Sequence, residues 1–334
     1  MKQAAMIRMR MTGVLTLSIM VLVLAWGQTV WAQPYLWKLG HVMPPSHPYN
    51  LGATEFAKLV EAETKGQVMI EVHHSGSLGS EKDMIEQLRF GALEVGLIST
   101  GPFAVIEPKM EAEQLPYAWP TRQHAYNAFD GELGKKFKEL LLAKNVYVLS
   151  WMENGYRHIT NNVRPIHKPE DLKGLKIRSA EVQMRLDTFK LMGVLPTPMA
   201  FTELFMALQQ GTVDGQENPL VTINVSKFYE AQKYLSLTGH IWGSTTLGVN
   251  KKVWDKLPKD LQEKVQQCAL QAAQYERGLI QKADAELVAE LTKKGMKVNE
   301  VDVQPFKAIV QPVYEKYKPV FGQEIMDLIG KYSK

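Results

Sequence analysis

Two arginines and one asparagine are the side chains of this 334-residue chain best suited to holding an anion. Arg178 ends the stretch 174–178, which reads as a strand, and Arg157 follows the predicted strand at 146–151. Arginine presents a planar fork of donors that grips a carboxylate in a fixed, two-point geometry. Asn218 adds an amide from a polar run. These residues predict a local anion site, unless each arginine pairs with an acid of the chain itself.

The segment 199–220 has to position Asn218. Its apolar residues recur at i, i+3, i+4 and i+7, which predicts a short helix with one buried face, and Gly211 is the expected stop. After the helix we expect a short strand at 212–213 and a polar turn at 214–219, because glycine and asparagine favour turns. This spacing indicates that the apolar face packs in the core and does not bind a ligand. The face consists of Phe201, Leu204, Phe205 and Leu208.

Further polar candidates lie at strand ends in the first hundred residues. Apolar and β-branched runs alternate with helical patterns, and the connecting loops are short. That order predicts parallel βα units, in which ligands bind at the carboxyl ends of the strands. The candidates at such ends are His41, Glu81 and Ser99.

The rest of the chain predicts a second βα half and a long helix. We expect separate strands at 146–151 and 158–161, with a crossing between lobes near 154–157. Residues 258–294 contain no proline after the first position, which predicts a helix of about 55 Å that bridges both lobes. The predicted fold is α/β, with two lobes and a mixed sheet in each. The expected boundaries are 33–154 with 244–283 for lobe I, and 155–243 with 284–334 for lobe II.

The first 32 residues have the pattern of a secretory signal peptide. Three basic residues precede an apolar run at 14–25, and Val30-Trp31-Ala32 offers small residues at the cleavage positions, so cleavage is expected after Ala32. A retained membrane anchor is the alternative, but the run falls short of the roughly 20 residues that a membrane span needs.

Charge and cysteine content narrow the function. Residues 1–32 hold three of the 39 basic residues and none of the 35 acids, so without them the net charge falls from +4 to +1. A nearly neutral chain offers no electrostatic basis for binding nucleic acid or a membrane surface. The single cysteine, Cys268, cannot form an internal disulfide and is expected to be a small buried hydrophobe.

Signatures of catalysis are missing from the sequence. There is no Gly-x-Ser-x-Gly elbow and no Gly-x4-Gly-Lys-Ser/Thr phosphate loop. His73 and His74 would point to opposite faces of a strand, which makes a poor metal pair. No cofactor, metal site or enzymatic activity is therefore expected. An enzyme acting on a carboxylate remains an alternative, with Glu81 or Glu181 as its general base.

Two long segments carry a family resemblance. They are GYRHITNNVRPIHKPEDLKGLKIR at 155–178 and PTPMAFTELFMALQQGTVDGQENPL at 196–220. Together with GSLGSEKDMIEQLRFGALEVG at 76–96, they closely resemble the periplasmic solute-binding proteins of tripartite ATP-independent (TRAP) transporters, of the C4-dicarboxylate-binding type. The resemblance extends along essentially the whole chain after residue 32.

The resemblance implies roles for individual residues. Arg178 would form a paired salt bridge with the carboxylate of the solute, Asn218 would bond the same carboxylate, and Arg157 would add a second cation. Phe201 would pack on the ligand, while Glu81 and Ser99 would contact the rest of it. Sialic-acid-binding relatives carry a glutamate at the position of Ser99, so the identity of the solute stays open.

The resemblance also implies a partner and a location. The protein would be a periplasmic monomer that delivers a small organic acid to TRAP membrane subunits. The acid could be a C4-dicarboxylate, a sugar acid such as a uronate, or a 2-oxo acid. We favour a sugar acid, because acidic residues near the site would repel a second carboxylate. The polar residues that would suit a hydroxylated solute are His41, Glu81, Glu153 and Glu181. A ligand-sensing receptor is the remaining alternative.

Overall fold

The first half of the sheet is built as the alternating pattern predicts. The computed structural model describes residues 33–334, so the predicted signal peptide lies outside the described residues. Strand β1 (Tyr35–Gly40) pairs in parallel with β2 (Val68–His73) and with β3 (Val95–Ser99). Helices α2 (Pro48–Glu63) and α3 (Glu81–Phe90) connect them.

A single strand joins the two halves of the sheet. We predicted two separate strands on either side of a crossing near 154–157, and the division into two strands is wrong. Strand β4 (Val146–Asn161) is continuous over 16 residues. Its register against β9 (Trp242–Asn250) shifts between Val148 and Ser150 and again between Glu153 and Gly155. Such bulges bend a strand and increase its twist, so they accommodate the passage between the halves without ending the strand.

The second half of the sheet lies beyond β4, where the strand order is β4-β7-β5-β6. Strand β7 runs antiparallel to β4, and β5 runs parallel to both β6 and β7. Two further strands, β8 and β10, pair with each other, and β8 also pairs with β4. The bounds are β5 (Lys176–Ser179), β6 (Leu195–Pro198), β7 (Gly215–Pro219), β8 (Tyr234–Leu237) and β10 (Lys297–Glu300).

The expected polar turn at 214–219 is a fully buried strand, β7, and that prediction is also wrong. Polar side chains can occupy a buried strand when each finds a partner. Glu217 bonds Arg157, and the side chain of Gln216 donates to Thr160 Oγ1 at 2.9 Å. The polar residues of this segment are therefore those of a buried strand whose partners lie on other segments. The local sequence pattern does not show these partners.

Short helices cover the sheet. The predicted helix at 201–208 forms as a 3₁₀ turn, η4 (Phe201–Glu203), followed by α7 (Leu204–Gln209), and Gly211 follows its end with φ of 68°. Between residues 33 and 334, no helix combines the length and hydrophobicity that a membrane crossing needs. The others are α4 (Arg122–Asp130), α5 (Glu132–Leu142), α6 (Gln183–Leu191), α8 (Leu220–Val225), α9 (Lys251–Trp254), α11 (Gln304–Ile309), α12 (Gln311–Phe321) and α13 (Gln323–Tyr332).

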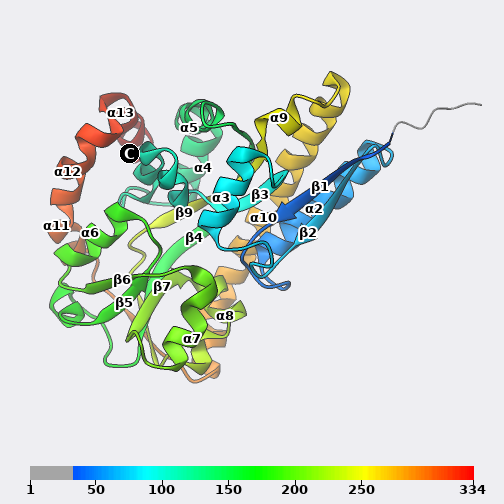
Figure 1. Ribbon diagram of the computed structural model, residues 1–334. Helices are drawn as coiled ribbons and strands as arrows, with labels where there is room; N and C mark the ends of the chain where they lie inside the picture. The colour runs from blue at the N-terminus through cyan, green and yellow to red at the C-terminus, as the bar shows by residue number, and fades with distance from the viewer. Residues whose placement is uncertain (1–32) are drawn as a thin grey trace, which may run out of the picture. The chain divides into compact units, whose positions relative to one another are not determined.

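Helix α10 (Lys259–Lys293) is the long helix that the sequence predicts. Its 35 residues correspond to about 52 Å. It packs against α2 and β4 and, further along, against α8 and β10 (Figure 1). The helix therefore contacts both halves of the sheet.

The buried side chains form three clusters. One includes β1, β3 and the helices α2 to α5, and a second lies under α7, α8 and the later part of α10. The third lies around β5 and α6. Helix α13 packs against α4 and α5, and the first cluster includes Val313, Tyr317 and Phe321. The predicted lobe II range 284–334 thus contains a segment that packs on the first half.

Candidate functional site

Arg178 is a buried cation that has no acidic partner within the described part of the chain. It is the third residue of β5 and only 2% exposed. Its Nε and Nη2 both donate to the carbonyl oxygen of Met199, at 3.0 and 2.7 Å. Among residues 33–334, no carboxylate lies within ion-pairing distance of it. Its guanidinium lies 5.9 Å from the centre of the Phe201 ring.

Arg157 is different, because it pairs with an acid of the chain. It lies on β4, and Glu217 lies on the neighbouring strand β7. Its Nη2 donates to Glu217 Oε1 at 3.0 Å, to the Glu217 carbonyl at 2.7 Å and to Asn218 Oδ1 at 2.9 Å. Its Nε also bonds Glu217 Oε2. The internal pairing that competes with anion binding thus applies to Arg157 and not to Arg178.

A third arginine, Arg185 on α6, lies in the same cluster and was missed from the sequence. Its Nη1 donates to Glu217 Oε1 at 2.9 Å and its Nη2 bonds Gln114, while its Nε finds no partner among the residues that the structure describes. The available signal was an arginine between the apolar residues Met184 and Phe189. Only the fold shows that the whole side chain is buried, at 2% exposure.

The charges in this cluster shift one another. Burial lowers the pKa of Arg178 to about 10; attraction by Glu217 opposes the shift, and repulsion from the other two arginines adds to it. Burial would raise the pKa of Glu217, but Arg157 and Arg185 hold it well below its ordinary value. The pKa of His240, whose Nε2 lies 3.3 Å from Glu217 Oε2, is lowered by burial. Glu217 is therefore an anion that neutralises only part of the positive charge.

The other wall of the site comes from the first half of the chain. Ser80 caps α3 and so places Glu81 at the first position of this helix, where its Oε1 accepts the Ser99 backbone N–H at 2.9 Å. The Asn154 amide donates to Ser99 Oγ at 3.3 Å, while its Oδ1 is buried without a partner. This wall offers acceptor oxygens and one hydroxyl.

These residues enclose one narrow cavity of about 20 Å³, and an adjoining cavity of about 30 Å³ shares Arg178, Glu81 and Phe201. Of these two cavities, Glu181 lines the adjoining one and not the first. Each space is little larger than a single water requires. Six residues predicted from the sequence line the first cavity: Glu81, Ser99, Arg157, Arg178, Phe201 and Asn218.

Two predicted site residues do not line either cavity. His41 is fully buried, with Nε2 3.2 Å from Asn50 Oδ1 and Nδ1 accepting the Met43 N–H at 3.2 Å. Glu153 accepts bonds from Arg122 Nε at 2.7 Å and Trp242 Nε1 at 3.1 Å. Both side chains are occupied in holding neighbouring segments, so we leave them out of the site.

Two contacts join the halves of the chain beside residues of the site. The loop at Gly76 packs so closely on η4 that a Cβ at Gly76 would lie 2.6 Å from Thr202 Cγ2, next to Phe201. Glu111 accepts the backbone N–H groups of Gln183 and Met184, next to Arg185, at 3.0 and 2.8 Å. The two halves are therefore in direct contact close to the site.

Comparison with known proteins now decides the family. The profile described as "Bacterial extracellular solute-binding protein, family 7" matches residues 39–319. The chain belongs to this family. A solute-binding protein of Verminephrobacter eiseniae is 38% identical over 82% of each chain. This family 7 protein therefore belongs to the solute-binding proteins, as the sequence predicts. Solved structures of relatives confirm its two-lobe α/β fold.

Several solved structures of relatives contain organic acids, among them sugar acids and succinate. A TRAP periplasmic solute-binding protein from Polaromonas sp. JS666, bound to D-erythronate, is 37% identical with a TM-score of 0.87, covering 90% of this chain and 98% of that one. A sugar-acid-binding protein from Advenella mimigardefordensis, in complex with galactonate, is 32% identical with a TM-score of 0.87 and the same coverages. The resemblance to TRAP solute-binding proteins is thus confirmed.

Proposed function

We propose that this family 7 protein captures a small organic-acid anion through Arg178 and delivers it to a TRAP membrane permease. The observation that carries the proposal is the burial of Arg178 without a carboxylate partner among the described residues. A buried cation is costly unless it is paired, and a ligand carboxylate would supply the pair. Arg157, which is held by Glu217, and Asn218, which accepts from Arg157, would complete the hydrogen bonds of that carboxylate.

We propose a hydroxylated monocarboxylate as the solute class, which includes sugar acids. D-erythronate and galactonate, found in the two related structures, are acids of this class. The wall formed by Glu81, Ser99 and Asn154 presents acceptors that suit ligand hydroxyl groups. A second carboxylate would meet the carboxylate of Glu81 and be repelled. A C4-dicarboxylate is therefore the less favoured solute.

Loading requires the lobes to separate. Each cavity is little larger than one water molecule requires, and the contacts at Gly76 and Glu111 hold the two halves together beside the site. Hinge motion around β4 and α10, the elements that contact both halves, would open the site. A ligand that binds only the closed form then shifts the population toward closure.

Location and partners follow from the same proposal. Cleavage after Ala32 would release the protein into the periplasm, where the related TRAP proteins operate. It would act as a monomer without a cofactor and release its solute chemically unchanged. Mass spectrometry of the exported protein checks the cleavage, and recovery of unaltered ligand checks the absence of turnover.

The Arg178→Ala variant tests the carboxylate contact. Removing one partner of a buried ion pair typically costs about 3–5 kcal/mol. We expect the affinity for D-erythronate, measured by calorimetry, to fall by at least about two orders of magnitude. Arg89→Ala is the matched control, because Arg89 is partly exposed and pairs only with Glu86. Near-wild-type affinity in Arg178→Ala would remove the basis of the proposal.

A ligand screen by thermal unfolding tests the solute class. A ligand at 100 times its Kd stabilises a protein by about 2.7 kcal/mol. We expect hydroxylated monocarboxylates such as D-erythronate and galactonate to raise the unfolding temperature more than succinate does. In Glu81→Gln the disadvantage of succinate should shrink, since the repelling charge is gone. Stronger stabilisation by succinate in the wild type would contradict the proposed class.

A further inference from the structure

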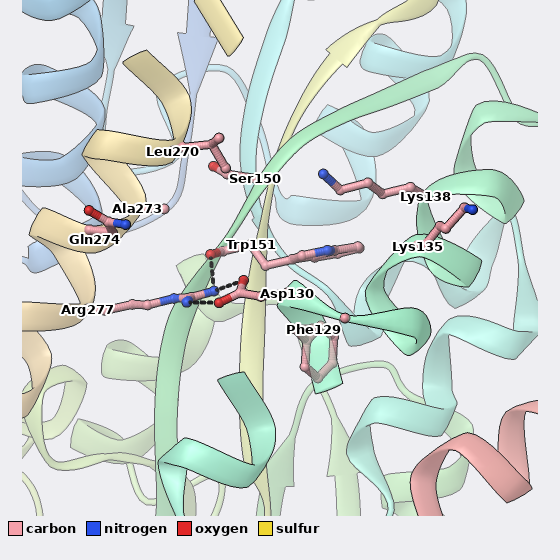
Figure 2. Close-up of a pocket in the computed structure, with 11 residues that line it drawn as sticks. Phe129, Asp130, Lys135, Lys138, Ser150, Trp151, Leu270, Ala273, Gln274 and Arg277 are labelled. Atoms are coloured by element: carbon pink, nitrogen blue, oxygen red, sulfur yellow. Dashed lines mark hydrogen bonds and ion pairs between the residues drawn. The ribbon is translucent and has the colours of Figure 1, made fainter. Parts of the chain in front are cut away.

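A larger cavity lies away from the solute site. It has a volume of about 400 Å³ and is bounded by α5, β4 and α10. Sites for small molecules commonly measure about 300–1,000 Å³, so its size fits a compact organic ligand. Figure 2 shows Lys138 extending from α5 and Arg277 extending from α10 toward Asp130. It shares no lining residue with the cavity at Arg178.

The charge of this cavity is positive. Asp130, the acid in its wall, is held by Arg277 through two bonds of 2.7 and 2.9 Å. In the described part of the chain, neither Lys135 nor Lys138 has a carboxylate within ion-pairing distance. Lys136, between them in the sequence, differs because it pairs with Glu324 at 2.6 Å. Two ammonium groups at the cavity are therefore left without a counter-charge.

Lys138 is a weakly bonded donor of this cavity. Its ammonium has only a 3.4 Å contact with the Leu149 carbonyl, and burial lowers its pKa. Ser150 Oγ and Trp151 Nε1 also lack hydrogen-bond partners among residues 33–334, but both atoms lie beneath the accessible surface and do not face the cavity. Since buried donors are normally satisfied, a ligand group that bonds Lys138 would complete its shell.

The same cavity has an apolar side. Leu270 is 43% exposed there, and Phe129, Ala273 and the Trp151 ring also line it. An inorganic ion would leave these surfaces in contact with water. A ligand with both an anionic group and an apolar body would use both sides of the cavity.

We infer that the cavity between α5, β4 and α10 is a second binding site, which takes a small organic monoanion with a compact apolar body. The anionic group lies at Lys135 and Lys138, and the apolar body packs between Leu270 and Trp151. The two sites differ in the ligand that they suit. The solute site offers hydrogen-bond acceptors to ligand hydroxyl groups, whereas the second site offers an apolar surface.

The test measures benzoate binding to the full chain that carries Arg178→Ala. This variant is used so that the solute site does not contribute to the binding. The ¹H–¹⁵N signal of the Trp151 indole, assigned by comparison with Trp151→Phe, reports occupancy. We expect a saturable shift with a Kd of about 1 mM or tighter. Lys138→Met should weaken benzoate binding by about fivefold or more, and Lys135→Met should weaken it in the same direction.

Lys136→Met is the matched control, because this lysine lies on the same helix but has its own acid. It should change the benzoate affinity by less than about twofold. Unsaturable shifts, equal binding by Lys138→Met, or equal binding of the neutral benzyl alcohol would each overturn the inference. None of these outcomes would affect D-erythronate binding by the wild-type protein, which is measured separately.

Discussion

Two buried polar clusters on β4 have opposite imbalances of charge. Around Arg157 the cations are in excess: Arg157, Arg178 and Arg185 surround Glu217. A few residues away the acids are in excess in a second cluster, which contains Glu153, Glu276 and Asp284. Arg122 bonds Glu153 and Asp284, while Glu276 accepts the Glu153 backbone N–H.

The two clusters resolve their excess in different ways. Burial raises the pKa of Glu276 well above its ordinary value, and burial raises that of Asp284 to about 6, so the acidic cluster can keep protons. The pKa of Arg178 falls only to about 10, so the guanidinium stays charged at neutral pH. A buried acid can therefore be neutralised by a proton, whereas a buried arginine needs an anion.

The largest effect on stability is expected from breaking the cationic cluster. Glu217→Ala leaves Arg157 and Arg185 buried without their acid. The free energy of unfolding, measured in urea without ligand, should fall by about 3–5 kcal/mol. The control is Glu324→Ala, which removes the exposed partner of Lys136 and should cost less than about 1 kcal/mol. Equal losses in both variants would show that Glu217 does not hold the arginines together.

Replacing Glu276 tests whether the acidic cluster keeps a proton, through the pH dependence of stability. Its pKa is higher in the folded than in the unfolded protein, so the wild type loses stability as the pH rises above the unfolded value of 4.5. Glu276→Gln carries no such proton. Its free energy of unfolding relative to the wild type should therefore increase between about pH 5 and pH 8, by up to about 1.4 kcal/mol per pH unit.

The matched control for Glu276 is Glu286→Gln, an exposed acid on the same helix. The stability difference between this variant and the wild type should stay nearly constant across the same pH range. A constant difference for Glu276→Gln as well would mean that the buried carboxyl is ionised.

The smallest effect is expected from Arg178→Met in the absence of ligand. Since no acid of the described chain pairs with Arg178, its removal leaves no unpaired charge behind. The free energy of unfolding should change by no more than about 1 kcal/mol. Arg157→Met, in contrast, should destabilise the protein, because Glu217 loses a partner. Equal destabilisation by both variants would indicate that Arg178 has an internal partner.

Local patterns predicted much of the fold. The helix Glu81–Phe90 has a capping serine before it and a glycine after it, so both ends were predictable from short-range signals. The 35-residue helix α10 was predictable because no proline interrupts it. The prediction of a turn at 214–219 was wrong because the partners of Gln216 and Glu217 lie far away in the sequence.

The candidate site was predictable in part. Arg178, Asn218 and Arg157 were selected by residue type and family resemblance, and they do line one cavity. Arg185 was missed because a helical position gives no sign of what faces it. His41 and Glu153 were included because they follow or flank strands, yet their side chains bond neighbouring segments.

The sequence by itself determined the class of fold, the family and the residue types available for an anion. The tertiary structure decided which arginine is available. Glu217 is fixed in β7 opposite Arg157 and close to Arg185, and no acid between residues 33 and 334 takes that place beside Arg178. Charge pairing depends on distances of a few ångströms between segments far apart in the chain, and these distances exist only after the sheet has formed.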